Sequence, residues 1–319
     1  MLFDKRGPQR MFMPESWTVD YVEERFRELR PPIVISFFDR YSHLNCLLET
    51  ILKSKNVDEY DIFVVQDAHP TTVHDKKEQE NLKIRIAQMR HQTAIHFVER
   101  ESNYGVGINA RSFGSSAIEV ADSCIFLEDD LEVAPGFLEF ATEGISQALK
   151  NPHKILGVNG YMPPLPTQTK DGSISPILMK RFHGWGVGHI GYHWKQIQWP
   201  SIQDYRLLID HFRDEINDNL GPDVWNMIRG TCFGVLDAGD VSVWVYCLLN
   251  RLSVITPSVS LTKNNGFDGS GQHSVKTNAF DIKTLPTQTE FDWEQIKESP
   301  KMIKKAVEFR NLMAVGGEK

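Results

Sequence analysis

The first 130 residues alternate between short apolar runs and longer amphipathic segments. The apolar runs lie at 33–38, 60–66, 94–98 and 123–127. Each has the length of a buried strand, and the segments between them can form helices. In one of these, 44–52, leucine and isoleucine recur at helical spacing. Because strands joined by helical crossovers run parallel, the alternation predicts an α/β fold with a mostly parallel, doubly wound sheet.

The second half of the chain is less regular. We expect helices at 136–149, 202–216, 224–228 and 241–249, strands at 155–159 and 252–255, and a loop rich in Pro, Thr and Ser at 161–176. No linker separates the halves, so the pattern predicts one unit with two lobes. Residues 1–30 read as an N-terminal extension, with a short helix from 16 to 30. Residues 281–319 read as a C-terminal helical tail.

Composition excludes some classes of protein. The chain is 41% hydrophobic and 24% charged, with a net charge of −7. This is typical of a soluble globular protein and argues against general nucleic-acid binding. The four cysteines form no C-x-x-C pair, and no apolar run is long enough to span a membrane. The MLFDKRGPQR start lacks the apolar core of a signal peptide. These features predict reduced thiols and a cytoplasmic location.

Three consecutive carboxylates, Glu128, Asp129 and Asp130, follow the fourth apolar run. Adjacent carboxylates at a strand end repel one another unless a cation is present. They therefore predict a divalent metal site, Mn²⁺ or Mg²⁺, at the mouth of the sheet. Asp130 is the expected ligand because it lies farthest out, while Glu128 and Asp129 would shape the site. A solvated turn before a helix, favoured by the helix dipole, is the alternative.

Other candidates follow the neighbouring strands. Asp67 could bind a base or ribose edge, or could be a turn residue. Asn103 opens a segment with two glycines that leads into a helix bearing Arg111. Backbone N–H groups and a guanidinium there would suit a diphosphate, although such glycine pairs are often simple turns.

The second half supplies four more candidate residues. Trp185, between two glycines, could stack on a sugar ring or fill a tight core turn. Asp237 and Asp240 precede an apolar helix, where one could be a general base and the other an N-cap. His273, in the turn-rich loop 264–273, could complete a metal shell or touch a phosphate, or could have no such role.

Taken in this order, the motifs resemble those of the GT-A glycosyltransferases. The chain is most similar to bacterial family-2-type enzymes and to the Golgi N-acetylglucosaminyltransferase that initiates complex N-glycans. The stretch LEDDLEVAP (127–135) is nearly identical to the metal (DXD) motif of that Golgi enzyme. Looser similarities are the strand 33–38, Gln66-Asp67, the segment 103–111, Gly184-Trp185-Gly186 and the loop 264–273. The resemblance covers residues 30–280 approximately.

The resemblance implies an inverting, metal-dependent transferase. It would move a sugar, an N-acetylhexosamine among the candidates, from a UDP-sugar to a hydroxyl of a glycan or lipid-linked acceptor, as in polysaccharide biosynthesis. Residues 31–135 would be the nucleotide-binding half and 136–280 the acceptor-side half. Asp130 and His273 would bind the metal, and Asp240, in preference to Asp237, would be the base. The donor-binding residues would be Phe37, Asp67, Asn103, Arg111, Glu128, Asp129 and Trp185.

Departures and alternatives remain. The family's base often lies in a W-D-x-W-like setting, whereas here Gly239 precedes Asp240 and Trp244 follows it by four residues. A sugar-nucleotide pyrophosphorylase would carry a glycine-rich phosphate loop after the first strand, but 38–42 contains no glycine. A non-catalytic nucleotide- or carbohydrate-binding module is a third hypothesis.

The C-terminal tail also allows two interpretations. Its basic residues could lean on an anionic membrane at the inner face, where a lipid-linked acceptor resides. A docked or solvated helix is the favoured interpretation, because the apolar face of the tail is modest. The basic residues are Lys297, Lys301, Lys304, Lys305 and Arg310.

Overall fold

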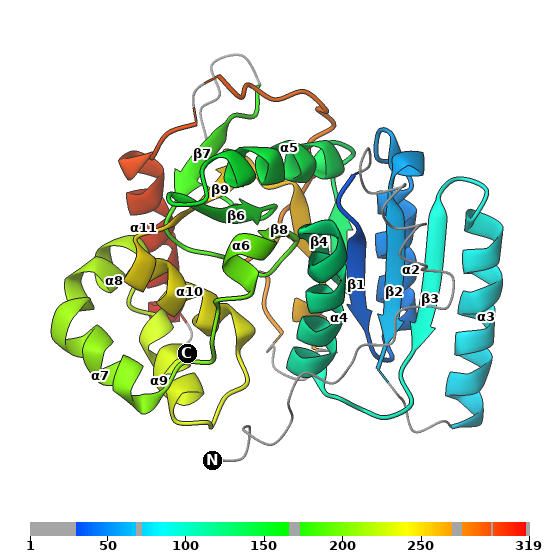
Figure 1. Cartoon of the computed structure of the whole chain (residues 1–319), viewed down its shortest axis with the longest axis horizontal. Coiled ribbons are helices and arrows are strands. Elements are labelled where there is room, and N and C mark those ends of the chain that lie inside the picture. The colour runs from blue at the N-terminus through cyan, green and yellow to red at the C-terminus, as the bar shows by residue number, and fades with distance from the viewer. Residues whose placement is uncertain (1–29, 68–71, 166–172, 270–275, 295, 317–319) are drawn as a thin grey trace.

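The computed structural model describes residues 30–67, 72–165, 173–269, 276–294 and 296–316 (Figure 1). The expected N-terminal helix and His273 therefore lie outside the described residues, apart from Arg30 at the end of that helix.

The first half forms the predicted alternation of strands and helices. Strands β1, β2, β3 and β4 are parallel and stand in the order β3-β2-β1-β4. The expected strands and helices are all present, and most bounds are within a few residues of those expected. The elements are β1 (Ile33–Phe37), α2 (Tyr41–Ile51), η1 (Val57–Glu59), β2 (Asp61–Gln66), α3 (Val73–Met89), β3 (Ala94–Glu99), α4 (Val106–Ala121) and β4 (Ser123–Glu128).

Successive residues of the central strands pack on opposite faces of the sheet. Ile33 and Ile35 of β1 join the cluster formed with α2, α3 and α5 (Phe137–Lys150). Val34 joins the cluster formed with α4 on the other face. Because helices cover both faces of the sheet, these strands are continuous apolar runs in the sequence and do not alternate between apolar and polar residues. The predicted doubly wound α/β sheet is confirmed for this half.

The sheet continues beyond β4 in the order β4-β8-β6-β9-β7, which makes eight strands in all. In this half β6 (Ile155–Asn159) and β9 (Ser253–Pro257) keep the parallel direction. Both β8 (Val187–Ile190) and β7 (Pro176–Met179) are antiparallel to their neighbours. The sheet is therefore mixed, although mostly parallel. Neither antiparallel strand was expected, because each is only four residues long and β8 contains a glycine in a glycine-rich setting.

Helices gather beside this end of the sheet (Figure 1). The expected helix at 202–216 is two helices that meet at Phe212, where the backbone leaves helical geometry. The helices are α6 (Gly191–Trp194), α7 (Ile202–His211), α8 (Arg213–Asn219), α9 (Val224–Cys232), α10 (Gly239–Asn250) and α11 (Pro300–Gly316). A separate two-stranded sheet pairs β5 (Leu131–Val133) with β10 (Thr262–Asn264), which precedes the turn η2 (Gly266–Asp268).

The region expected to be a helical tail is helical only in α11. The stretch before it is extended and packs on the sheet, with bridges from Ile174 to Phe291 and from Leu178 to Glu298. Helix α11 packs beside α8 and buries Ile303 and Arg310. This matches the docked interpretation of the tail. Within the described part of the chain, no helix is long and apolar enough to cross a membrane.

Candidate active site

The strand order changes direction between β1 and β4. After β1 the chain crosses to β2 and β3 on one side, whereas β4 lies on the other side of β1. In open α/β sheets, the crevice beyond the carboxyl ends of two such strands is the usual ligand site. Asp39 and Arg40 follow β1 there, and Asp129 and Asp130 follow β4. Two segments some 90 residues apart in the chain thus meet at one edge of the sheet.

Arg40 joins the two carboxylates that follow β4. Its Nη1 lies 2.8 Å from Asp130 Oδ2, and its Nη2 pairs with Asp129 Oδ1. Asp129 is only 3% exposed and Asp130 only 7%. Buried carboxylates need a counter-ion, and Arg40 provides it. Sequence reasoning missed Arg40, although a basic residue just beyond the first buried strand was the available signal.

One guanidinium does not fully neutralise this acidic cluster. Burial, followed by the charges of Asp130, Asp240 and Asp129, raises the pKa of Glu128 well above its usual value. Burial also raises the pKa of Asp129 to about 7, although Arg40 acts in the opposite direction. Asp130 Oδ1 is buried and has no hydrogen-bond partner. The cluster therefore retains an acceptor oxygen and excess negative potential.

These features fit a hard divalent cation. Such ions bind oxygen and often use only one or two protein carboxylates, the remaining ligands being water and phosphate. The unpartnered Asp130 Oδ1 is the atom suited to that role. No group of three or more His, Cys, Asp or Glu side chains that could hold a metal occurs in the described residues. Any metal held by these residues would thus need oxygens from a ligand.

The segment after β10 covers the carboxylates. The Asn265 N–H donates to the Asp130 backbone carbonyl at 2.8 Å, and its side-chain amide donates to Glu132 at 2.7 Å. Gly266 lies so close to the Asp130 carboxylate that a Cβ there would collide with Asp130 Oδ2. The glycine thus permits this close approach, and the predicted loop 264–273 begins over the site.

Asp67 holds the loop before α4. Its two carboxylate oxygens accept the N–H groups of Tyr104 and Gly105, both at 2.8 Å. The Asn103 side chain also accepts the Gly105 N–H, at 2.9 Å, and Gly105 has a φ of +77°. The positive φ explains the glycine. Both predicted residues thus organise this loop at the edge of the sheet, and any contact with a nucleotide would be additional.

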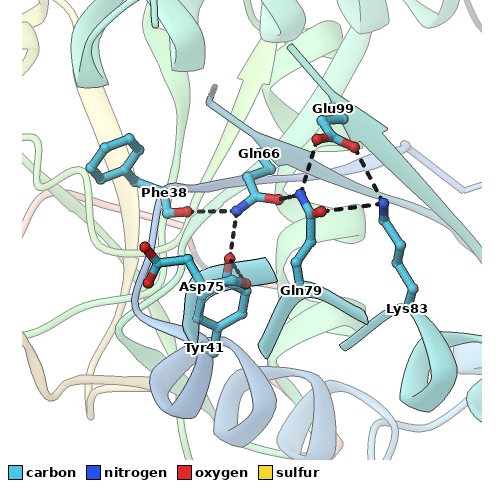
Figure 2. Close-up of polar contacts among 7 residues, drawn as sticks. All are labelled: Phe38, Tyr41, Gln66, Asp75, Gln79, Lys83 and Glu99. Carbon is cyan, nitrogen blue, oxygen red and sulfur yellow. Dashed lines mark hydrogen bonds and ion pairs between the residues drawn. The ribbon is translucent and has the colours of Figure 1, made fainter. Parts of the chain in front are cut away.

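A buried glutamine joins the ends of the first three strands (Figure 2). Gln66, the last residue of β2, donates to the Phe38 carbonyl at 2.9 Å and to the Tyr41 hydroxyl at 3.1 Å. Its own carbonyl accepts from Gln79 at 2.6 Å, and Gln79 also donates to Glu99 at the end of β3. This network holds together the strand ends that Arg40 and Asp67 follow. Sequence reasoning did not assign it.

Two predicted donor-binding residues point into the protein. Phe37 is buried, and its ring packs edge-on against Tyr41 with centroids 5.1 Å apart. Arg111 donates to the Ile197 backbone carbonyl, and burial lowers its pKa. The guanidinium that reaches the carboxylates is therefore that of Arg40.

Residues 181–185 form a strap in the second half of the chain, and each residue is held by a different partner. The distances lie between 2.8 and 3.2 Å. The pairs are Arg181 with Asp223, the Phe182 carbonyl with Trp244, the His183 N–H with Asn159, the Gly184 N–H with Asp240, and the Trp185 carbonyl with Thr262.

The ring of Trp185 forms part of an aromatic wall. Its centroid lies 4.5 Å from that of Tyr161, 5.4 Å from Phe267 and 5.8 Å from Phe280, all with edge-on geometry. Trp185 remains partly exposed. Because Phe267 belongs to η2 beside the carboxylates, this wall links the strap to the candidate metal site.

The two candidate bases, Asp240 and Asp237, have different surroundings. Asp240, in the first turn of α10, is partly exposed and accepts the Gly184 N–H at 3.1 Å. Burial raises its pKa to about 6, opposed by that hydrogen bond and by Arg181 and Arg310. Its charge also raises the pKa of Glu128, so it lies near enough to act on the acidic cluster. Asp237 is exposed and lies against Gly107, at the start of α4.

Comparisons with known proteins give only distant likenesses. Neither a scan against protein-family models nor a search of curated proteins finds a match. Among solved structures, the chain is similar to TarS 1–349 from S. aureus at 15% identity and a TM-score of 0.40. The match covers 73% of this chain and 60% of that one. TarS has also been solved with UDP and with UDP-GlcNAc.

Two further likenesses are weaker. The mannosyltransferase PcManGT from Pyrobaculum calidifontis, solved with GDP-Man and Mn²⁺, shares 12% identity over 56% of this chain and 52% of that one, with a TM-score of 0.34. The glycosyltransferase GlyE from Streptococcus pneumoniae shares 11% over 71% and 45%, with a TM-score of 0.36. At these TM-scores, the function of the site is inferred from the residues of this chain.

Proposed function

We propose that the protein is an inverting, metal-dependent glycosyltransferase of the GT-A type, which transfers a sugar from a UDP-sugar to a hydroxyl of a glycan or lipid-linked acceptor. One observation carries the proposal. The Asp129–Asp130 pair and Asp240, from opposite halves of the chain, both lie near enough to Glu128 for their charges to raise its pKa.

The donor would bind at the carboxylate side of the crevice. Asp130 is the residue suited to hold a divalent ion, through its unpartnered Oδ1. Such an ion, when bound, neutralises the charge that develops on the departing diphosphate. Arg40 would be released from part of its ion pair by this ion and could then donate to a phosphate oxygen. The aromatic face of Trp185 would stack on the sugar and orient it.

The acceptor hydroxyl must lose a proton as it attacks the anomeric carbon. Asp240 is suited to receive that proton, because a pKa of about 6 leaves it ionised at neutral pH while keeping it more basic than an ordinary aspartate. The Gly184 N–H holds its Oδ2 and so fixes the direction of the carboxylate. Attack from this side with departure of the diphosphate is a single displacement, which inverts the anomeric centre.

The direct test is a panel of UDP-sugars with Mn²⁺, in the presence and absence of EDTA, with products identified by NMR. We expect transfer or slow donor hydrolysis that EDTA abolishes, and a β-linked product from an α-linked donor. If no sugar nucleotide is turned over with metal present, or if the product keeps the donor configuration, the proposal fails.

One observation favours a second candidate. Arg40 pairs with both Asp129 and Asp130, so the protein itself compensates part of their charge, as expected of a nucleotide-binding module that needs no ion. Calorimetry separates the two functions. UDP binding that does not change when Mn²⁺ is added, together with no turnover, would indicate such a module.

A further inference from the structure

Two buried arginines from distant parts of the chain meet beneath the strap. Arg181 is the first residue of the strap and is 8% exposed, whereas Arg310 comes from α11 and is 7% exposed. The Arg310 Nη2 lies 3.4 Å from His183 Nδ1, and its guanidinium lies 4.8 Å from the centre of the Phe280 ring. Arg181 lies 5.1 Å from the Trp244 ring. The two cations thus share one largely desolvated region.

The carboxylates form a direct ion pair with only one of these guanidiniums. Asp223 forms a two-pronged ion pair with Arg181, with both distances 2.9 Å. Among the described residues, no carboxylate lies within ion-pair distance of Arg310, and Asp223 and Asp240 act on it from a longer range. His183 does not compensate, because burial and both arginines lower its pKa well below the usual value and leave it neutral. A buried cation without a partner is costly, so an anion is expected nearby.

Three of the residues that line one small cavity at this place have unpartnered hydrogen-bond donors. They are Arg181 Nε, Arg310 Nε and the Tyr161 hydroxyl, and all three are buried and have no partner. About 10 Å³ of the cavity admits the centre of a water-sized atom. That is close to the minimum for a single water molecule and too small for a phosphate or carboxylate group, whereas a monatomic anion, somewhat larger than water, requires only a slight shift of the long side chains that line the cavity.

We propose that this cavity binds one monatomic anion, chloride under ordinary conditions, held by Arg181 Nε, Arg310 Nε and the Tyr161 hydroxyl. A water molecule would satisfy these donors but would bring no negative charge into contact with Arg310. Chloride accepts from all three and neutralises the unpaired guanidinium. The site lies outside the proposed reaction centre, so it can exist whether or not the protein is a glycosyltransferase.

Binding at this position would couple chloride to the docking of α11. Arg310 reaches the cavity only when α11 lies against α8, and Tyr161 also contacts Trp185 of the aromatic wall. A ligand that binds only the folded protein raises its stability in a saturable way. Chloride should therefore raise the melting temperature, whereas an anion too large for the cavity should not.

The experiment measures thermal unfolding of the full chain in sodium chloride and in sodium gluconate at equal ionic strength. For the wild type we expect chloride to raise Tm above the gluconate value by about 2–4 °C, levelling off with concentration. Tyr161→Phe, which removes one donor with little change in shape, should reduce the difference. Arg310→Met should abolish it. Lys304→Met removes a charge from an exposed position of the same helix and should leave the difference intact.

A crystal grown with bromide gives the second measurement. The proposal expects an anomalous bromine peak between the three donors. Equal Tm values in the two salts, or a cavity that holds only water in bromide crystals, would overturn it. Because the bromide measurement uses the wild-type protein, it remains decisive even if Arg310→Met fails to fold.

Discussion

The two halves of the sheet position their acidic residues in different ways. In the first half, four parallel strands joined by helices bring Arg40, Asp67 and Asp129–Asp130 to one edge of the sheet. In the second half, Asp240 is placed by the strap 181–185, whose residues are fixed one by one through side-chain and backbone hydrogen bonds. A regular topology thus specifies the first site, whereas individual contacts specify the second.

The strongest test of this comparison is the base itself. If the acceptor-side half supplies the base through Asp240, then Asp240→Asn should lower kcat by about 10²–10⁴-fold. Binding of UDP with Mn²⁺, measured by calorimetry, should not change, because the nucleotide and its diphosphate would contact residues of the first half. The matched control is Asp237→Asn, three residues earlier and exposed, with an expected loss of less than about threefold. The reverse pattern would make Asp237 the base.

Truncations of core side chains test whether the two halves of the sheet unfold together or separately. Leu47→Ala in the first half and Leu208→Ala in the second each remove a fully buried side chain and should each cost about 2–5 kcal/mol. Since β4 pairs directly with β8, we expect both to shift a single unfolding transition. Leu249→Ala, at an exposed position of α10, is the control. Two transitions in calorimetry, each moved by only one variant, would show that the halves unfold separately.

A glycine lies against the acidic residue of each half. At Gly266 a Cβ would collide with Asp130 Oδ2, and at Gly184 it would lie 2.7 Å from Asp240 Oδ1. We expect Gly266→Ala to weaken Mn²⁺-dependent donor binding, and Gly184→Ala to lower kcat with donor affinity kept, each by about 10–100-fold. Gly239→Ala is the control, because nothing lies within 4 Å of its added Cβ. If both variants affected the same kinetic constant, the two halves would not act separately.

The pH dependence gives the smallest expected effect. Because burial raises the pKa of Asp240 to about 6, kcat/KM should rise about tenfold per unit below pH 6 and level off above it. The folded state binds this proton more tightly than the unfolded chain does, so Asp240 lowers stability as the pH rises from about 4 to 6. Asp240→Asn should therefore melt about 2–4 °C above the wild type at pH 7 and match it at pH 4. A variant without this gain would contradict the raised pKa.

Much of the first half could be predicted because buried parallel strands leave a clear pattern. Apolar runs and amphipathic helices indicate the fold, and the fold places Asp130 at the strand ends. The pattern could not reveal Arg40, since its partners lie 89 and 90 residues away. Short antiparallel strands such as β8 carry little periodicity. The strap depends on contacts between Gly184 and Asp240, 56 residues apart, for which no local signal exists.

The docking of α11 has a consequence for the order in which the protein is built. The strands β1, β2 and β3 join neighbours in the chain, and such local contacts form early and quickly. The contact between Arg310 and His183 spans 127 positions and the one between Asn265 and Glu132 spans 133, so each must wait for a long stretch of chain to be made. During synthesis the sheet edge with Asp67 could therefore take shape while the neighbourhood of Asp240 is still open. A nascent chain halted before α11 would carry every strand of the described sheet but would lack the contact between Arg310 and His183.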